Sequence, residues 1–155
     1  MPPLSGGLRS RLWVAAQFGV LGAMVAWPAP WRVDAPALAL GVTAVAAAAW
    51  VLAYNRPGNF NIRPDPRAGG VLITGGPYRW VRHPMYVSLL LGAGAVAVAA
   101  HAPTQAVLWL VLLGVLEGKA SMEERLLTLR WPEYDAYRAR TGRFMPRLRR
   151  LPRRP

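Results

Sequence analysis

The stretch Gly75-Gly-Pro-Tyr-Arg-Trp-Val-Arg-His-Pro-Met-Tyr86 decides how the rest of this chain is interpreted. It brings a glycine pair, two prolines, two tyrosines, a tryptophan, two arginines and a histidine together directly before a long apolar run. Polar, cationic and aromatic groups that converge at a membrane boundary are costly to keep there without a function. We therefore expect this stretch to form a binding site together with the acidic pair Glu123-Glu124 further along the chain.

The composition indicates a membrane protein with a single domain. The 155 residues are 54% hydrophobic and only 17% charged, which is poor in charge for a soluble domain. The 19 Lys and Arg residues outnumber the 7 Asp and Glu residues, and these charges lie between apolar blocks, as basic cytoplasmic loops do. Nucleic-acid binding, the other common reason for a basic excess, is therefore not expected. The chain has no cysteine and only two histidines, which argues against disulfides and against a metal site.

Apolar runs predict an all-α, integral membrane helical bundle that takes in the whole of residues 1–155. The first two predicted crossings, 12–31 and 35–54, carry no charge, and each would be about 30 Å long as a helix, enough to cross a bilayer core. The first run could instead be a cleaved secretory signal. Because more spanning candidates follow, we favour a crossing.

The third apolar run, 84–116, predicts a helical hairpin. As one helix it would be about 50 Å long, too long for a single crossing. Ala102-Pro103 breaks the run, so we expect crossings at 84–100 and 104–120, which makes four in all. The last helix is expected to continue beyond the lipid to about residue 129.

Two segments outside the apolar runs differ in kind. The segment 55–83 holds five arginines, a single acid and many prolines and glycines, which exclude a long regular helix. Loops of this length are usually functional or disordered, and its aromatic content favours an ordered cofactor-site loop. The segment 121–155 is predicted to be cytoplasmic, with a short surface helix at 133–143 and an arginine-rich tail on anionic headgroups.

The distribution of charge predicts the orientation. Both termini and the segment 55–83 are basic, whereas the two opposite connections are short and nearly uncharged. The positive-inside rule therefore places both termini and this segment in the cytoplasm, as in a multi-pass protein of a bacterial inner membrane. His83 and the pair Glu123-Glu124 then lie at one membrane face, on the two legs of one hairpin.

Each candidate residue has an ordinary explanation when it is taken alone. Lys119 precedes Glu123 by one helical turn and could form a surface ion pair worth a few tenths of a kcal/mol. The arginines could be headgroup anchors, and the aromatic residues could form an interfacial belt. It is their combination, in this order and at one membrane face, that favours a site. Glu123 and Glu124 point about 100° apart on a helix, so that one can face the bundle and the other the loop.

This combination resembles the isoprenylcysteine carboxyl methyltransferase family and its phospholipid methyltransferase relatives, over about residues 72–146. The resemblance rests on Gly76-Pro-Tyr-Arg-Trp-Val-Arg-His-Pro-Met-Tyr86, on Glu123-Glu124 with Leu126-Leu127, and on Tyr134-Asp-Ala-Tyr137 leading to Arg143-Phe-Met-Pro146. Two positions depart from the family pattern. Trp131-Pro132 stands where relatives often have Phe-Gly, and Lys119 stands where the eukaryotic carboxyl methyltransferases have an arginine.

The resemblance implies a small membrane enzyme that uses S-adenosylmethionine. The residues that it implies around the cofactor are Tyr78, His83, Pro84, Tyr86, Gly92, Glu123 and Glu124. The chemistry of these side chains agrees, because tyrosine faces suit a sulfonium cation and an adenine, and carboxylates suit an ammonium or ribose hydroxyls. The candidate catalytic residues are Arg82, Lys119 and Glu123, the two cations for an anionic group and the carboxylate as a possible base.

The implied methyl acceptor is a lipophilic molecule that enters from the surrounding membrane lipids. It could be a carboxylate, such as a prenylcysteine-like group, or an aminolipid, so O- and N-methylation both stay open. Lys119 cannot make the flat, two-pronged grip on a carboxylate that arginine makes. Two alternatives are a nicotinamide-dependent membrane reductase of the sterol or enone type, which shares the His-Pro-x-Tyr feature, and a non-catalytic protein with a vestigial site.

Overall fold

The computed structural model describes residues 5–55 and 71–147, and this part of the chain is all-α, as predicted. Its elements, in chain order, are α1 (Ser5–Ala26), α2 (Ala35–Tyr54), the 3-10 turn η1 (Gly76–Arg79), α3 (Pro84–Ala99), α4 (Pro103–Arg130) and α5 (Tyr134–Arg140). The predicted break before Pro103 is confirmed, and α3 and α4 form a hairpin.

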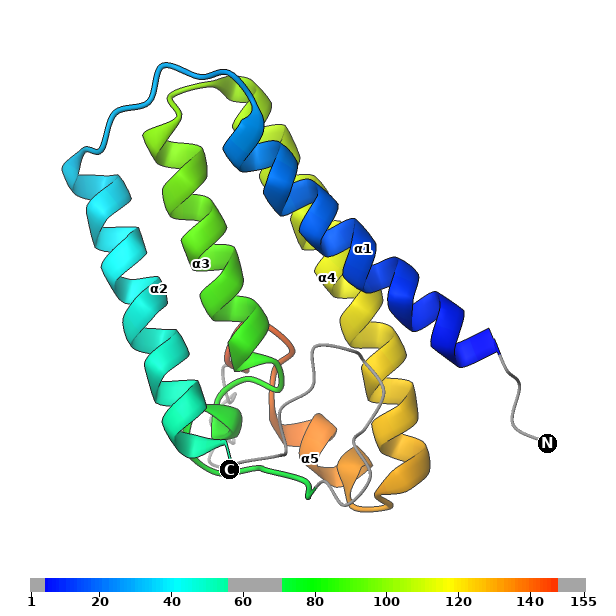
Figure 1. Cartoon of the computed structure of the whole chain (residues 1–155). Coiled ribbons are helices and arrows are strands. Elements are labelled where there is room, and N and C mark those ends of the chain that lie inside the picture. Colours follow the sequence, from blue (N-terminus) through cyan, green and yellow to red (C-terminus); the bar gives the residue numbers. More distant parts are fainter. Residues whose placement is uncertain (1–4, 56–70, 148–155) are drawn as a thin grey trace, which may run out of the picture.

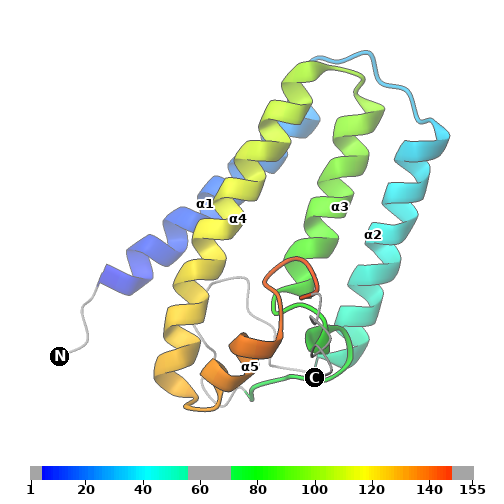
Figure 2. The ribbon, with the colours of Figure 1, turned by 180° about the vertical axis from the view of Figure 1, so that it is seen from behind.

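The four long helices form two pairs that share one interface. α2 packs along α3, α1 packs along α4, and contacts between α3 and α4 join the pairs. Figures 1 and 2 show the α1–α2 connection and the α3–α4 turn at one end of the bundle. They show η1, α5 and the chain after α5 together at the other end. Segments far apart in the sequence therefore meet at that end.

The structure supports part of the predicted membrane topology. In the described residues, α2 and α4 are long and apolar enough to cross a membrane, and α3 is a shorter apolar helix. Only 17% of the apolar window of α2 is buried, so side chains such as Val42 and Val45 face outward, as in helices that contact lipid. α1, which includes Arg9 and Arg11, is not among the helices that are long and apolar enough to cross a membrane. Four crossings therefore stay a prediction.

The helix ends agree with the sequence signals to within a few residues. α1 ends at Ala26, shortly before Pro28, rather than at the predicted residue 31. Asp34 caps α2, because its side chain accepts a hydrogen bond of 2.9 Å from the amide of Ala37. Gly76 has a φ of +55°, and a Cβ atom there would lie 2.5 Å from the ring of Tyr54, so glycine lets η1 fit against the end of α2.

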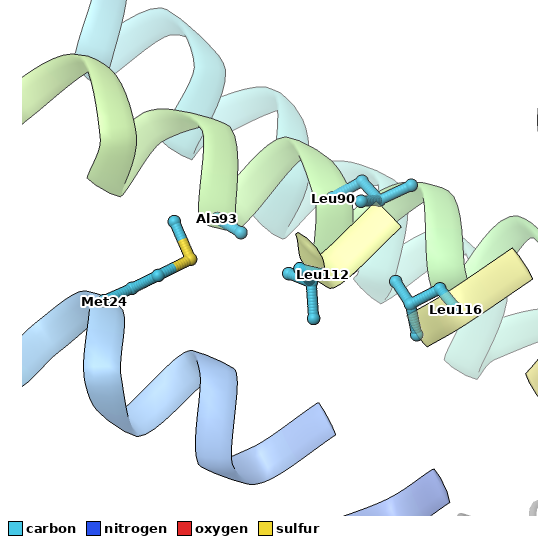
Figure 3. Packing of buried hydrophobic residues seen from close by; sticks show 5 residues of the cluster. All are labelled: Met24, Leu90, Ala93, Leu112 and Leu116. Carbon is cyan, nitrogen blue, oxygen red and sulfur yellow. The ribbon is translucent and has the colours of Figure 1, made fainter. Parts of the chain in front are cut away.

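A small apolar core joins α1, α3 and α4. It consists of one methionine, one alanine and three leucines (Figure 3): Met24, Leu90, Ala93, Leu112 and Leu116. These side chains lie on the inner faces of the three helices, while many large apolar residues of α1, α2 and α4 are exposed. Such an outward-facing apolar surface fits an integral membrane protein.

The segment after α4 confirms the predicted short surface helix but shortens it. The expected surface helix 133–143 is α5, which ends at Arg140 and buries Tyr134 and Tyr137 against the bundle. The chain then runs back to α3, where Gly142 forms an isolated parallel bridge with Val81. Sequence periodicity missed this return because it depends on contacts with a distant segment. Part of the predicted loop 55–83 (56–70) and most of the predicted tail (148–155) lie outside the described residues.

Candidate functional site

Glu124, on α4, is the centre of the polar cluster at the end of the bundle. It is only 2% exposed, and both of its carboxylate oxygens accept hydrogen bonds. Its Oε1 accepts from Arg82 Nε at 2.9 Å and from Arg143 Nε at 3.1 Å, and it lies 3.1 Å from His83 Nε2. Its Oε2 accepts from Arg143 Nη2 at 2.9 Å. A buried carboxylate is stable only with such partners, so Glu124 joins three elements in one network.

Arg143 ties the chain after α5 to two turns of α4. In addition to Glu124, its Nη1 donates to Glu117 Oε2 at 2.6 Å and to Ser121 Oγ at 3.0 Å. These acceptors occur at positions 117, 121 and 124, which share one face of a helix. The hydrogen bond to Glu124 raises the pKa of the Arg143 guanidinium above its ordinary value. This arginine therefore remains charged under all ordinary conditions.

Arg82 holds the start of α3 against the same returning chain. Its side chain donates to Glu124 and to the backbone carbonyls of Arg138 and Thr141. The backbone continues this contact, because Arg82 N donates to Gly142 O at 2.8 Å and His83 N donates to Arg143 O at 3.2 Å. The Arg82 side chain is 7% exposed and is held by these partners, so it connects the start of α3 to α4 and to the returning chain.

Glu123, the neighbour of Glu124, faces a different set of groups. Its Oε2 accepts a 2.8 Å hydrogen bond from Tyr86 Oη and lies 3.6 Å from His83 Nδ1. The rings of His83 and Tyr86 are stacked, with centroids 5.1 Å apart and planes 7° from parallel. The side chain of Glu123 is 28% exposed, whereas that of Glu124 is 3% exposed. Of the two glutamates, Glu123 has the carboxylate that a ligand can reach.

Lys119 reaches the site from one turn earlier on α4 and is 1% exposed. Its ammonium donates to Gln17 Oε1 on α1 at 2.6 Å and lies 5.2 Å from the centre of the Tyr86 ring. The ordinary interpretation, a surface pair of Lys119 with Glu123, is therefore wrong in its placement. The lysine is buried and turns toward α1, because an amide oxygen and an aromatic face satisfy its charge there.

Aromatic residues from three segments line the cluster. Phe144 meets His83 and Tyr86 edge-on, with ring centroids 6.0 and 6.2 Å away. Tyr78, in η1, accepts a 2.6 Å hydrogen bond from Tyr137 Oη through its backbone oxygen. Burial, with a smaller contribution from the negative charge of Glu123, raises the pKa of the Tyr78 phenol to about 12. These rings make a largely apolar wall beside the Glu123 carboxylate.

Most of the residues singled out from the sequence meet at this end of the bundle. Arg82, His83, Tyr86, Lys119 and the glutamate pair are linked by the contacts above, and Tyr78 lies within electrostatic range of Glu123. Pro84 is buried as the first residue of α3.

Gly92 is placed elsewhere. It lies on α3 against Ala44 of α2, where a Cβ atom would have an ordinary contact of 3.7 Å. The structure therefore puts this glycine at a helix–helix contact rather than in contact with the cluster.

Several residues of the cluster have no role in the sequence-based prediction, among them Glu117 and Ser121, which accept hydrogen bonds from Arg143. Gln17 could have been found from the sequence, because an amide in the middle of an apolar run is unusual. Arg143 and Phe144 belong to a quoted motif, but only the fold shows their contacts with α3 and α4. In the described part of the chain, no group of three or more His, Cys, Asp or Glu side chains could hold a metal ion.

Comparison with known proteins identifies the chain at family level. The family model described as phospholipid methyltransferase matches residues 34–131. The cobalt-zinc-cadmium resistance protein CzcN of Cupriavidus metallidurans is 39% identical over 83 residues, which are 53% of this chain and 38% of that protein. The nickel-cobalt-cadmium resistance protein NccN of Alcaligenes xylosoxydans xylosoxydans is 37% identical over 78 residues, which are 50% of this chain and 37% of that protein.

An uncharacterized protein of Schizosaccharomyces pombe is also similar, with 34% identity over 80 residues, which are 47% of this chain and 23% of that protein. The matched part thus spans less than two fifths of the length of each of these relatives. The family model, by contrast, takes in α2, α3, α4 and the paired glutamates. The chain therefore belongs to the phospholipid methyltransferase family.

Proposed function

We propose that this protein is a membrane methyltransferase that transfers a methyl group from S-adenosylmethionine to a lipophilic acceptor. The observation that carries the proposal is the meeting of His83 and Tyr86 with Glu123 at one end of the bundle. Membership of the phospholipid methyltransferase family supports the reaction class. The cofactor supplies an activated methyl group on a sulfonium, and the protein has to bind, orient and shield it.

The side chains of the cluster fit the groups of this cofactor. Glu124 is saturated by Arg82, His83 and Arg143, so it supports the site rather than receiving a ligand. Glu123 keeps an accessible carboxylate, which suits an ammonium group or ribose hydroxyls. The rings of Tyr78 and Tyr86 lie within the electrostatic reach of that carboxylate and suit a cation or an adenine face.

Lys119 is the group that we assign to an anionic group of the methyl acceptor. Its ammonium has three donors, of which one goes to Gln17 and one side faces the Tyr86 ring. A donor that remains in a buried site is worth more to an anion than the same donor in water. The acceptor could then be a carboxylate, which is already ionised, or an amine whose proton passes to Glu123.

The catalytic contribution that we propose is alignment and the exclusion of water. Methyl transfer removes charge from the sulfonium, so orientation of the acceptor and a dry site account for most of the rate gain. Phe144 and the returning chain cover the His83–Tyr86 stack on one side. The exposed apolar faces of the helices suit an acceptor that arrives from the lipid.

Binding of S-adenosylhomocysteine to the purified protein in detergent, measured by calorimetry, tests the proposal. We expect binding by the natural sequence and a loss of at least about tenfold in affinity for Glu123→Gln, because a charged hydrogen-bond partner is removed. NADPH is the comparison ligand for the reductase alternative. Binding of NADPH without binding of S-adenosylhomocysteine would overturn the proposal.

A second experiment identifies the acceptor. Membranes with and without the protein are incubated with isotope-labelled S-adenosylmethionine, and the extracted lipids are compared. We expect label in a lipid fraction only when the natural sequence is present, and none with Glu123→Gln. Cofactor binding without any labelled product would support the non-catalytic alternative.

A further inference from the structure

A polar residue of α1 reaches the cluster from outside the part of the chain that matches the family model. Gln17 lies on the inner face of α1, is 7% exposed and accepts the 2.6 Å hydrogen bond from Lys119. The family model begins at residue 34, so it includes neither α1 nor this amide. Burying an amide in an apolar helix costs free energy unless the amide is hydrogen-bonded, and polar residues within such helices often mark a functional site.

Lys119 and Glu123 are four residues apart on α4, the spacing at which opposite charges pair on a helix. In a buried site such a pair would be strong, because water does not screen it. Nevertheless, Lys119 donates to Gln17, and Glu123 accepts from Tyr86. The ammonium thus donates its hydrogen bond to the neighbouring helix, while the Glu123 carboxylate stays within electrostatic range of it without a direct ion pair.

We propose that Gln17 is a positioning residue that keeps Lys119 from pairing with Glu123. The inference rests on the proposed function, in which Glu123 receives the cofactor. A neutral amide oxygen suits this task, because it holds the ammonium without neutralising its charge. The two groups then form no direct ion pair with each other, so that Glu123 is available to a cation and Lys119 to an anion. Through Gln17, α1 therefore helps to position the charged groups of the site.

The variant Gln17→Leu tests this role directly. Leucine has a similar volume and suits an apolar helix, so the helix packing is kept. Without the amide, the Lys119 ammonium has Glu123 as its nearest strong partner, and the pair that forms occupies the carboxylate. We expect affinity for S-adenosylhomocysteine to fall at least about tenfold, as for the loss of a hydrogen bond to a charged group.

Gln105→Leu is the matched control. Gln105 is another fully buried amide at the α1–α4 contact, where its Nε2 donates to Met24 O at 2.8 Å. It lies near the start of α4, at the opposite end of the bundle from the site. This variant loses a comparable link between the two helices, and we expect its affinity to stay within about twofold of the natural sequence, as for a distant, independent site.

A second change separates positioning from packing. In Gln17→Leu with Lys119→Met, no ammonium remains to occupy Glu123, so we expect the affinity for S-adenosylhomocysteine to recover by at least about fivefold over Gln17→Leu alone. The melting temperatures of both variants are measured as well, because an unpaired buried ammonium is itself destabilising and Lys119→Met relieves that cost too. A positioning role predicts a loss of affinity in Gln17→Leu at an unchanged melting temperature, whereas a loss that follows the melting temperature in both variants would be structural. Should Gln17→Leu not fold, Gln17→Asn serves, because its amide is one methylene shorter and its oxygen lies further from the Lys119 ammonium.

The outcomes distinguish this inference from the function on which it rests. Binding to the natural sequence, loss in Gln17→Leu and recovery in the double variant support the positioning role. Unchanged affinity in Gln17→Leu, or a loss that Lys119→Met does not repair, overturns it while the proposed function stands. Absence of binding by the natural sequence overturns the proposed function itself.

Discussion

Arg143 grips Glu124 with two nearly side-by-side hydrogen bonds, Nε to Oε1 at 3.1 Å and Nη2 to Oε2 at 2.9 Å. The same guanidinium also reaches Glu117 and Ser121, so one side chain connects the returning chain to two turns of α4. This pair positions the whole polar end of the bundle, because Glu124 in turn holds Arg82 and His83.

The geometry of this grip predicts that Arg143→Lys is not a conservative change. Lysine presents a compact ammonium and cannot make the two-pronged contact. We expect the melting temperature to fall by several degrees and S-adenosylhomocysteine affinity to fall about tenfold, as for a lost charged hydrogen bond. The control is Arg130→Lys, at the exposed end of α4, where the arginine stacks on Trp131. Equal melting temperatures and affinities for the two variants would contradict this prediction.

Substitutions of the two glutamates are predicted to have different effects, one on stability and the other on ligand binding. Glu124→Gln leaves two guanidinium groups without their buried anion, which costs on the order of 3–5 kcal/mol of folding stability. Glu123→Gln removes a partly exposed carboxylate that, among the described residues, accepts a hydrogen bond from Tyr86 and lies beside His83. We therefore expect thermal unfolding to detect the change at Glu124 and ligand calorimetry to detect the change at Glu123. A normal melting curve for Glu124→Gln would show that the network is not needed for folding.

Gly118 is predicted to be needed for the contact between α1 and α4. A Cβ atom at this position would lie 2.2 Å from the Trp13 ring, which is too close for any real contact. We expect Gly118→Ala to lower the melting temperature. Gly114→Ala is the matched control, because it lies one turn earlier with nothing within 4 Å, and alanine favours a helix by about 0.5–1 kcal/mol. A stabilised Gly118→Ala would mean that the tryptophan moves freely.

The environment of Tyr78 predicts a loss of stability at alkaline pH. Its pKa is raised from 10.0 to about 12, chiefly by burial and then by Glu123, so the folded state keeps this proton more tightly than the unfolded state. The contribution is therefore fully present below pH 10 and is lost as the pH rises through about 12. We expect the melting temperature of Tyr78→Phe to fall less steeply over that interval. Parallel curves for both proteins would contradict the assignment.

The charge distribution predicts that both termini lie in the cytoplasm. A reporter that is active only outside the cytoplasm should therefore stay inactive when it is fused after Pro155 or before Met1. The same reporter placed between Trp31 and Val33, in the connection at the opposite end of the bundle, should become active. Activity at only one terminus would contradict four crossings, and activity at either terminus would contradict the predicted orientation and the proposed access of the cofactor from the cytoplasm.

The sequence alone determined the helices and the end at which the site lies. Apolar runs of crossing length, interrupted by prolines, predict α2, α3 and α4 because hydrophobic length and missing backbone donors act locally. The hairpin break then brings His83 and the glutamate pair to one end by simple geometry. Four crossings, the bound cofactor and the acceptor are predictions that the fold leaves to experiment.

Only the tertiary structure decided how the two glutamates differ and where Lys119 points. Adjacent residues on one helix have the same local signals, but Glu124 meets Arg82 and Arg143 while Glu123 meets Tyr86. Lys119 has Glu123 at ideal spacing, yet it turns to Gln17 on another helix. The physical reason is the same in each case: a buried charge is stabilised by whichever partner packing brings within hydrogen-bond distance, and packing between distant segments has no period in the sequence.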